Sequence, residues 1–261
     1  MSRTLLRASG IDVRFGGVHA LRDVTVSVGA GEICGLIGPN GAGKTTLFDV
    51  LSGMRRPDAG AIAYDDVDIT RRSSVWRARH GIRRTFQRQQ LFGQLTVADN
   101  LVVAQDWRGG VRPAARRHRE RAAAVLRECG IDALAGAYAG GLPVGQARMV
   151  ELARALADPP RVLLLDEPAS GTTAEERRKL AAVIRHMADE ENCAVLLVEH
   201  NVSFVMELCS RVVVLDLGRI LAEGTAAEVR ADPAVREAYL GAGPGSADDE
   251  HPDRSPSPPG P

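Results

Sequence analysis

The chain has 261 residues, 44% of them hydrophobic and 25% charged, which is the composition of an ordinary soluble globular protein. Its formal net charge is +0, so overall charge gives it no attraction to nucleic acid or to anionic lipid. The longest apolar runs are strand-sized, well short of the roughly 18 residues that suggest a membrane-spanning helix. Any work at a membrane would therefore need another subunit that crosses it.

The cysteine pattern predicts free thiols. The four cysteines stand far apart and form no C-x-x-C pair: Cys34, Cys129, Cys193 and Cys209. The N-terminal residues also lack an apolar signal region. Together these features predict buried thiols in a reducing cytoplasm.

The N-terminal part of the chain predicts antiparallel strands. Apolar and polar positions alternate within 5–13 and 24–28, and glycines punctuate the sequence between and after these stretches. A second, short hairpin is expected from 61–64 to 67–69, after a turn at 55–60. These elements predict a small antiparallel sheet.

Between these two regions lies a stretch that fits the pattern G-x-x-x-x-G-K-[ST] without a mismatch. It reads Gly38-Pro39-Asn40-Gly41-Ala42-Gly43-Lys44-Thr45-Thr46, after a strand-like run and before apolar residues at helical spacing. In that context backbone N–H groups converge on phosphate oxygens, and the following helix adds its positive end. Lys44 would reach the terminal phosphates, and the Thr45 hydroxyl would ligate Mg²⁺. The flanking strand and helix signals disfavour the alternative, a glycine-rich turn with a chance lysine.

Residues 76–154 are rich in Arg and Ala and predict a separate helical lobe. The helical pattern is broken at Gly109-Gly110, at Pro113 and over 135–141. A basic run over 112–121 is interpreted as a solvated helix face. A patch for anionic lipid headgroups or for a membrane subunit is the alternative.

An α/β pattern follows this lobe. Residues 162–165 are a continuous apolar run, as in a parallel strand buried on both faces, and further strands are expected at 194–198 and 212–215. Thr172-Thr173 have the capping-box spacing to glutamates three residues on, which predicts a helix start. The alternation predicts a parallel sheet with right-handed crossovers. The last residues, 241–261, have too few apolar side chains and predict a disordered tail.

The predicted strand at 162–165 ends in two carboxylates, Asp166 and Glu167. The carboxyl edge of a parallel sheet is also where the phosphate loop sits. We expect Asp166 to hold Mg²⁺, through water, and Glu167 to face the attacking water as general base. Two solvated acids at a strand end are the alternative, which the phosphate loop makes less attractive.

These motifs resemble the ATP-binding cassette of membrane transporters. The resemblance rests on residues that occur in the order and approximate spacing of that family, over roughly 4 to 240: Gly38–Thr46, Gln87, Leu142–Gln146, Asp166-Glu167 and His200. It implies an α/β fold: a P-loop NTPase core with a parallel sheet, an N-terminal antiparallel β subdomain and an inserted helical lobe. The implied boundaries are one domain over 1–240, with the core at 1–87 and 156–240 and the lobe at 88–155.

The resemblance also implies roles for three single residues. Phe15 would stack on adenine, since a flat ring offers area and a π face; a place in the core of the first hairpin is the alternative. Gln87 would touch Mg²⁺ and the attacking water through an uncharged amide. His200 would contact the γ-phosphate and hold Glu167 and the water in line.

The family's signature segment corresponds to residues 142–146, and it departs from the usual L-S-G-G-Q. In the family this segment closes over ATP bound to the opposite subunit, here through Pro143, Val144, Gly145 and Gln146. Pro143 has neither a hydroxyl nor a backbone N–H, and Val144 replaces a glycine. Thr173 stands where the family usually has Asp or Asn, which puts the coupling role of that loop in doubt.

The departure at Pro143 and Val144, together with the stretches 13–18, 85–87 and 95–104, resembles the subgroup of cassettes that serve branched-chain amino-acid importers. The resemblance implies a cytoplasmic ATPase, peripheral on the inner face of the cell membrane, that binds ATP and Mg²⁺. Implied partners are a second, different cassette in a heterodimer, membrane-spanning permease subunits and, indirectly, a substrate-binding protein, with no nucleic acid.

Other functions remain as alternatives. A cassette for amide or lipid substrates is possible, because transport specificity resides in other subunits. A soluble cassette of translation or DNA repair is disfavoured by the single cassette and by the lack of a long coiled-coil insertion. A GTPase function is disfavoured because the chain has no N-K-x-D segment to read guanine. Intact Glu167 and His200 disfavour a cassette that only binds nucleotide.

Overall fold

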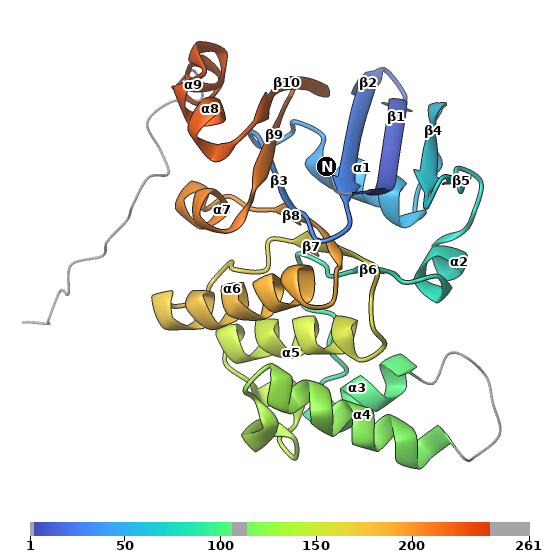
Figure 1. Ribbon diagram of the computed structural model, residues 1–261, viewed down its shortest axis with the longest axis vertical. Coiled ribbons are helices and arrows are strands. Elements are labelled where there is room, and N and C mark those ends of the chain that lie inside the picture. Colours follow the sequence, from blue (N-terminus) through green and yellow to red (C-terminus); the bar gives the residue numbers. More distant parts are fainter. Residues whose placement is uncertain (1–2, 106–113, 241–261) are drawn as a thin grey trace, which may run out of the picture.

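The computed structural model describes residues 3–105 and 114–240, and two sheets dominate it (Figure 1). The predicted tail at 241–261 and the predicted breaks at Gly109-Gly110 and Pro113 lie outside the described residues. Both sheet types expected from the sequence are present, so the α/β class with an antiparallel and a largely parallel sheet is confirmed.

The larger sheet has six strands in the order β10-β9-β3-β8-β7-β6. Its strands are β3 (Ile33–Ile37), β6 (Ile82–Arg84), β7 (Val162–Asp166), β8 (Ala194–Val198), β9 (Arg211–Asp216) and β10 (Arg219–Gly224). Pairing is parallel from β9 to β6, and only β10 runs antiparallel. Every residue of β3, β7 and β8 is buried, as their unbroken apolar runs predict.

The smaller sheet is antiparallel, in the order β2-β1-β4-β5. It consists of β1 (Thr4–Phe15), β2 (Val18–Gly29), β4 (Ala59–Tyr64) and β5 (Val67–Asp68). The long hairpin of β1 and β2 turns at Gly16-Gly17, and β4 pairs with the other edge of β1. The sequence prediction of these strands is confirmed.

The two faces of the larger sheet belong to two hydrophobic cores. One core packs Leu164 and Leu196 against α1 (Lys44–Ser52) and the antiparallel sheet. The other packs Leu163 and Leu197 against α5 (Val144–Leu156), α6 (Ala174–Asp189) and α7 (Val202–Leu208). Successive side chains point to opposite faces of a strand, so the alternation assigns each residue to one core.

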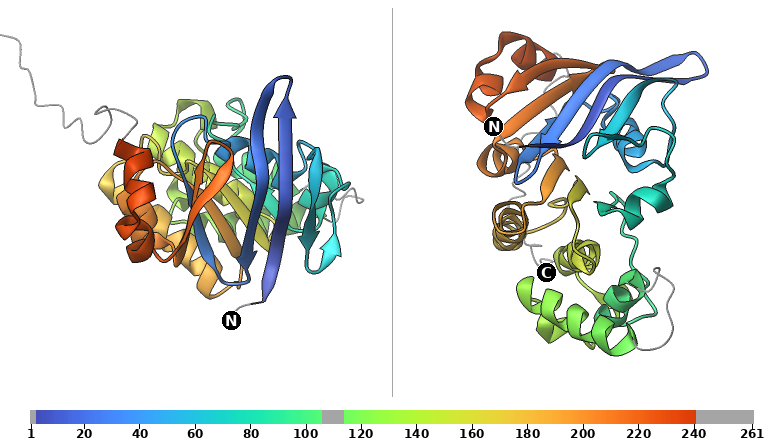
Figure 2. Two further views of the ribbon diagram at one scale, coloured as in Figure 1. Left: turned by 90° about the horizontal axis from the view of Figure 1, so that it is seen from above. Right: turned by 45° about the vertical axis from the view of Figure 1, so that its right-hand side comes forward.

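Helices α3 (Val97–Gln105) and α4 (Ala114–Glu128) lie apart from the sheet, beyond α5 (Figures 1 and 2). Two short 3-10 turns, η2 (Asp132–Leu134) and η3 (Ala139–Gly141), connect α4 to α5. The prediction of a helical lobe from residue 76 is wrong at its start, because residues 82–84 form β6, the edge strand beside β7, and 85–95 form neither helix nor strand. Three residues of strand are too short to produce a visible alternation in the sequence.

Three further elements were not expected from the sequence, and a fourth, helix α2 (Ser74–Arg79), overlaps the predicted helical stretch at residues 76–79. Helix α2 precedes β6, and β10 continues from β9 through a turn at Leu217-Gly218. Helices α8 (Ala226–Ala231) and α9 (Pro233–Leu240) follow β10. Across residues 3–105 and 114–240, no helix has both the length and the apolar character needed to cross a membrane.

Candidate functional site

The glycine-rich stretch 38–46 connects β3 to α1, as the motif requires. Gly38 has a positive φ of 154°, and a Cβ there would lie 2.0 Å from the carbonyl oxygen of Leu215. Only glycine lets the chain pass β9 this closely. Helix α1 begins after Gly43 without a side-chain cap, so its first N–H groups stay available to an anion.

A pocket of about 600 Å³ opens over this loop. It is lined by residues 40–46 and by Gln87, Glu167 and His200. The hairpin around the start of β2 and the turn after β9 also line it, namely Gly17, Val18, His19, Ala20, Arg22, Leu217 and Gly218. Three segments predicted from the sequence are thus brought to one cavity: the loop, the end of β7 and the end of β8.

The Lys44 side chain is folded back onto its own loop. Its ammonium group donates to the carbonyl oxygens of Gly38 at 2.7 Å and Pro39 at 2.9 Å. Burial lowers the pKa of Lys44, and the nearby carboxylates of Glu167 and Asp166 act in the opposite direction. An incoming phosphate oxygen could replace the loop carbonyls as acceptor for this cation.

Glu167 is held by two side chains from other parts of the chain. His200 Nε2 lies 2.7 Å from one carboxylate oxygen, and the Gln87 amide donates to the other at 3.0 Å. Glu167 itself has a positive φ of 50°, which is strained for a residue with a side chain. These features direct the carboxylate into the pocket, where it could accept a proton from water.

Asp166, the residue before, is 3% exposed and is not among the residues that line the pocket. One of its carboxylate oxygens lies 3.1 Å from the guanidinium of Arg84, which also pairs with Asp49 of α1 at 2.6 Å. Burial raises the pKa of Asp166, and Arg84 opposes this shift. Arg84 therefore joins the strand that carries the carboxylates to the helix that follows the loop.

The oxygen donors near the loop fit a hard divalent cation. They are the exposed Thr45 hydroxyl, the Gln87 amide oxygen and the Asp166 carboxylate. Mg²⁺ favours oxygen ligands and keeps several waters, so a buried carboxylate that acts through water suits it. The residues present fit Mg²⁺.

Phe15 lies at the end of β1, outside the wall of the pocket. Its ring is 47% exposed, which disagrees with a place in the core of the hairpin. The Arg55 guanidinium covers one face at 3.8 Å from the ring centre, and Arg55 is fixed by a hydrogen bond to the Arg14 carbonyl. One aromatic face thus has a cationic partner, as in cation–π pairs.

The predicted signature segment lies at the start of α5, apart from the pocket. Pro143 is the N-cap, and Val144 is exposed. A Cβ on Gly145 would lie 2.1 Å from the Glu176 carboxylate, so a larger residue here would displace that side chain. Gln146 lies in the first turn of α5. None of these four residues lines the pocket over residues 40–46.

The loop after Glu167 is ordered by capping interactions. Thr173 accepts from Glu176 N and the Glu176 side chain accepts from Thr173 N, which is the predicted capping box. Thr172, the other candidate, donates instead to the carbonyl of Ala169 at 2.6 Å. Thr173 thus starts α6.

The place of Glu199 in the site was not predicted from the sequence. It is 4% exposed and accepts hydrogen bonds from the backbone of Ala169 at 2.6 Å and of His200 at 3.0 Å. It therefore ties the loop after Glu167 to the residue that contacts Glu167. An acidic residue next to a candidate histidine, at the end of an apolar strand, was the available signal.

Arg84 and the far wall of the pocket were also missed. Arg84 stands three residues before Gln87, in a segment that was assigned only through the family resemblance. Its ion pairs with distant residues left no pattern in the sequence. His19 lines the pocket and lies 2.6 Å from Asp12, an interaction between neighbouring strands. Side chains that meet through tertiary packing have no fixed sequence spacing.

Comparison with known proteins gives consistent matches. The chain matches the family model described as ABC transporter over residues 21–170, and residues 219–244 match a model described as branched-chain amino acid ATP-binding cassette transporter. It is 40% identical to the high-affinity branched-chain amino acid transport ATP-binding protein BraF of Pseudomonas aeruginosa, covering 92% of this chain and 99% of BraF. It is 36% identical to the lipopolysaccharide export system ATP-binding protein LptB of Escherichia coli, covering 90% and 97%.

Solved structures agree with these matches. The ADP conformation of MJ1267, an ATP-binding cassette of an ABC transporter, superimposes with a TM-score of 0.83 at 30% identity, covering 92% of this chain and all of MJ1267. A nucleotide-free cassette from an ABC transporter gives a TM-score of 0.83 at 29% identity, covering 90% and 98%.

Proposed function

Because the chain belongs to the ATP-binding cassette family of transporter ATPases, we propose that it energises import of branched-chain or other hydrophobic amino acids. The chain is an ATPase subunit of a transporter, and the proposal concerns its substrate, its partners and the residues that act. The observation that carries the proposal is the meeting of the loop 40–46 with Glu167 in one pocket.

The proposed site binds the phosphates of ATP through residues 38–46. Backbone N–H groups and the open N-terminus of α1 would surround them, and Lys44 would exchange its loop carbonyls for the terminal phosphates. Adenine would lie toward Phe15, whose ring is half exposed. Thr45, Gln87 and Asp166 would hold Mg²⁺, which supplies charge neutralisation between the phosphates.

Hydrolysis would depend on Glu167. Its carboxylate would take a proton from the attacking water, and His200 and Gln87 would keep that carboxylate in place. Lys44 and the loop amides would stabilise the negative charge that develops on the phosphoryl oxygens. The positive φ of Glu167 supports this role, since strained residues gather at active sites.

The transport proposal involves partner molecules. The signature segment, Pro143–Gln146, would close over ATP on a second cassette, and that cassette's segment would complete this site. We propose a heterodimer, because Pro143 offers neither a hydroxyl nor a backbone N–H to the partner's phosphates. The lobe 88–155 would move against the core, 1–87 and 156–240, and push permease subunits from the cytoplasmic face of the membrane. A substrate-binding protein would deliver the cargo.

The substrate class is supported by the names of the relatives. BraF is named for branched-chain amino acid transport, and the model matched at 219–244 carries the same description. LptB, which is 36% identical, supports lipid export as the second candidate. Amide substrates are a further alternative within the importers.

The decisive experiment is co-purification followed by transport. The chain carrying Glu167→Gln, which should trap ATP, is expressed from its native gene neighbourhood and isolated with its partners. A second cassette, two permeases and an amino-acid-binding protein, with leucine uptake by vesicles of the wild-type complex, would support the proposal. A lipid-exporting permease as partner would contradict the substrate class, and a tight ATP-dependent homodimer in light scattering would contradict the heterodimer.

A further inference from the structure

Residues 85–95 connect β6 to α3, form neither helix nor strand, and carry Gln87. Backbone groups in such a segment must find partners elsewhere. Arg148 of α5 donates to the carbonyl oxygens of Phe86 at 3.2 Å and Gln87 at 2.7 Å. Glu151, one turn further along α5, accepts from Gln90 N at 2.7 Å. Side chains of α5 therefore replace the missing backbone partners.

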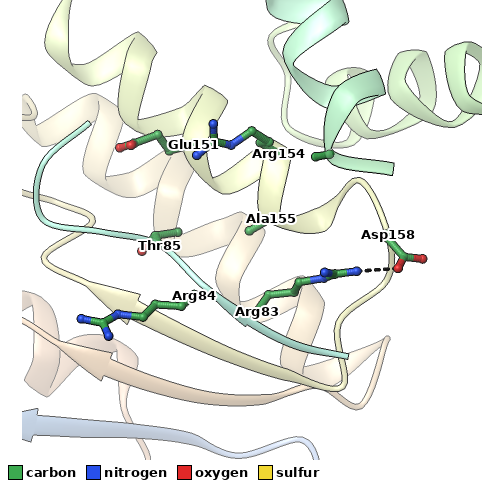
Figure 3. Close-up of a pocket in the computed structure, with 8 residues that line it drawn as sticks. Arg83, Arg84, Thr85, Glu151, Arg154, Ala155 and Asp158 are labelled. Carbon is green, nitrogen blue, oxygen red and sulfur yellow. Dashed lines mark hydrogen bonds and ion pairs between the residues drawn. The ribbon is translucent and has the colours of Figure 1, made fainter. Parts of the chain in front are cut away.

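These side chains are buried and paired with each other. The side chains of Arg148 and Glu151 are 10% and 4% exposed, and they form an ion pair at 3.0 Å. Arg154 adds a hydrogen bond to the carbonyl of Gln90. Figure 3 shows Glu151 and Arg154 projecting from α5 above the strand that carries Arg84. Residues three apart on a helix share a face, so one face of α5 holds this segment.

The segment held by α5 also contacts the Glu167 carboxylate, through Gln87. Gln87 is bound to Arg148 through its backbone carbonyl and to Glu167 through its side-chain amide. Arg148 lies four residues after Val144, the first residue of α5, which follows Pro143. A helix is stiff over its 13 residues, so a shift of its first turn moves Arg148 as well. The line of contacts therefore runs from the signature segment to Glu167.

We propose that Arg148 is a positioning residue that ties α5 to Gln87 and so sets where the Gln87 amide stands against Glu167. The inference rests on the proposed function, because it assumes that Glu167 activates water and that the start of α5 meets the partner's nucleotide. Arrival of that nucleotide at α5 would move Gln87 relative to Glu167. Each cassette would thereby sense its neighbour through its own chain.

A purely structural ion pair predicts a different outcome on mutation. It would lower stability without distinguishing catalysis from binding, and its effect would be independent of Gln87. A positioning role lowers kcat but leaves the KM for ATP nearly unchanged, because the loop 38–46 still binds nucleotide. It also makes the effect of Arg148 depend on Gln87.

The test compares variants of the assembled complex in steady-state ATP hydrolysis. Arg148→Met should lower kcat about tenfold and change KM by less than about twofold, the scale expected of a misplaced catalytic group. The kcat of Arg148→Lys should lie between those of wild type and Arg148→Met, because an ammonium group cannot reach both carbonyls and Glu151 in one plane. Arg121→Met is the control, since Arg121 donates to the Leu156 carbonyl at the far end of α5.

A double-mutant cycle gives the sharper criterion. Gln87→Ala combined with Arg148→Met should be no slower than Gln87→Ala alone, within about twofold. Multiplicative effects, or equal losses in Arg148→Met and Arg121→Met, would overturn the inference. Hydrogen exchange on the full chain is independent of activity: Arg148→Met should speed exchange over 86–92 about tenfold, with 38–46 unchanged. Unchanged exchange over 86–92 would also overturn it.

The outcomes separate this inference from the proposed function. A wild-type complex that binds no ATP, or hydrolyses none, would contradict the proposed function, whatever exchange over 86–92 reports. Normal wild-type hydrolysis with normal kcat in Arg148→Met would contradict only the role of Arg148.

Discussion

Nε2 of His200 lies 2.7 Å from a carboxylate oxygen of Glu167. An ionised carboxylate only accepts hydrogen bonds, so Nε2 of the imidazole must be the donor. The two residues end neighbouring parallel strands, β7 and β8, which brings side chains 33 positions apart into contact. The acceptor oxygens of Glu167 are thereby oriented before nucleotide arrives.

We expect Glu167→Gln to hydrolyse ATP about a hundredfold more slowly, because the general base is lost. Nucleotide affinity should persist, since residues 38–46 are untouched. Phosphate release measures the first quantity and a fluorescent ATP analogue the second. A near-wild-type rate of phosphate release would show that another group activates the water.

Removing the Arg84 side chain should destabilise the fold. Arg84→Met leaves the buried Asp166 without its cation and should lower the free energy of unfolding by about 3 kcal/mol. Arg185→Met is the matched control: its pair with Glu207 is exposed, so a change below about 0.5 kcal/mol is expected. Urea denaturation compares the two. Equally small losses of unfolding free energy in the two variants would mean that water solvates the Asp166 carboxylate when Arg84 is absent.

The buried cation of Arg77 should be equally important. Arg77 is 1% exposed and donates to the carbonyls of Val50 and Leu51, the last turn of α1, and of Ile69. Arg77→Met removes a donor from each carbonyl, although Val50 and Ile69 still accept from Gly53 N and Arg72 N, and should lower the free energy of unfolding by about 2 kcal/mol.

The exposed Arg71 provides the control for Arg77, and Arg71→Met should change the free energy of unfolding by less than about 0.5 kcal/mol. Thermal unfolding by circular dichroism is sufficient to rank the variants. Arg77→Met as stable as Arg71→Met would indicate that water reaches the end of α1.

Stability should depend on pH through Glu199. Burial raises the pKa of its carboxyl, while N–H groups of Ala169, His200 and Asn201 act against the shift. The native state thus holds this proton more strongly than the unfolded state, so the contribution is full below the ordinary pKa and is lost as pH rises through the native pKa. Glu199→Gln does not titrate.

The stability advantage of wild type over Glu199→Gln should therefore be largest at a pH below the ordinary glutamate pKa and shrink as the pH rises above it. Urea unfolding of both proteins below and above this pKa measures the difference. An advantage that grows with pH would mean that the N–H donors outweigh burial.

Phe15→Ala should weaken ATP binding about three- to tenfold, the scale of a lost aromatic stack. Phe15→Tyr should retain the affinity. Titration with a fluorescent ATP analogue measures both. An unchanged affinity in Phe15→Ala would assign the adenine contact to Val18 and Leu217, which line the pocket and are 66% and 77% exposed.

The sequence predicted the elements whose pattern is local. The loop 38–46, the strand 162–165 and the capping box at Thr173 each have a fixed spacing, and the structure has all three. The family resemblance is confirmed by the comparisons. Strand β6 was missed because three residues carry too little periodicity, and its place at the sheet edge depends on pairing with β7.

Interactions between distant segments were beyond such reasoning. Arg84 reaches Asp49 and Asp166, and Arg148 reaches the backbone of Gln87, only because the sheet and α5 bring them together. No spacing rule relates such residues. The roles assigned to individual site residues remain predictions for the experiments above.

The space beside Gly145 and the cap of α6 both depend on the Glu176 side chain. The Glu176 carboxylate fills the space that a side chain at position 145 would occupy, while it also caps α6 through Thr173. Any larger residue at 145 would therefore push the Glu176 side chain aside, at the cost of that cap.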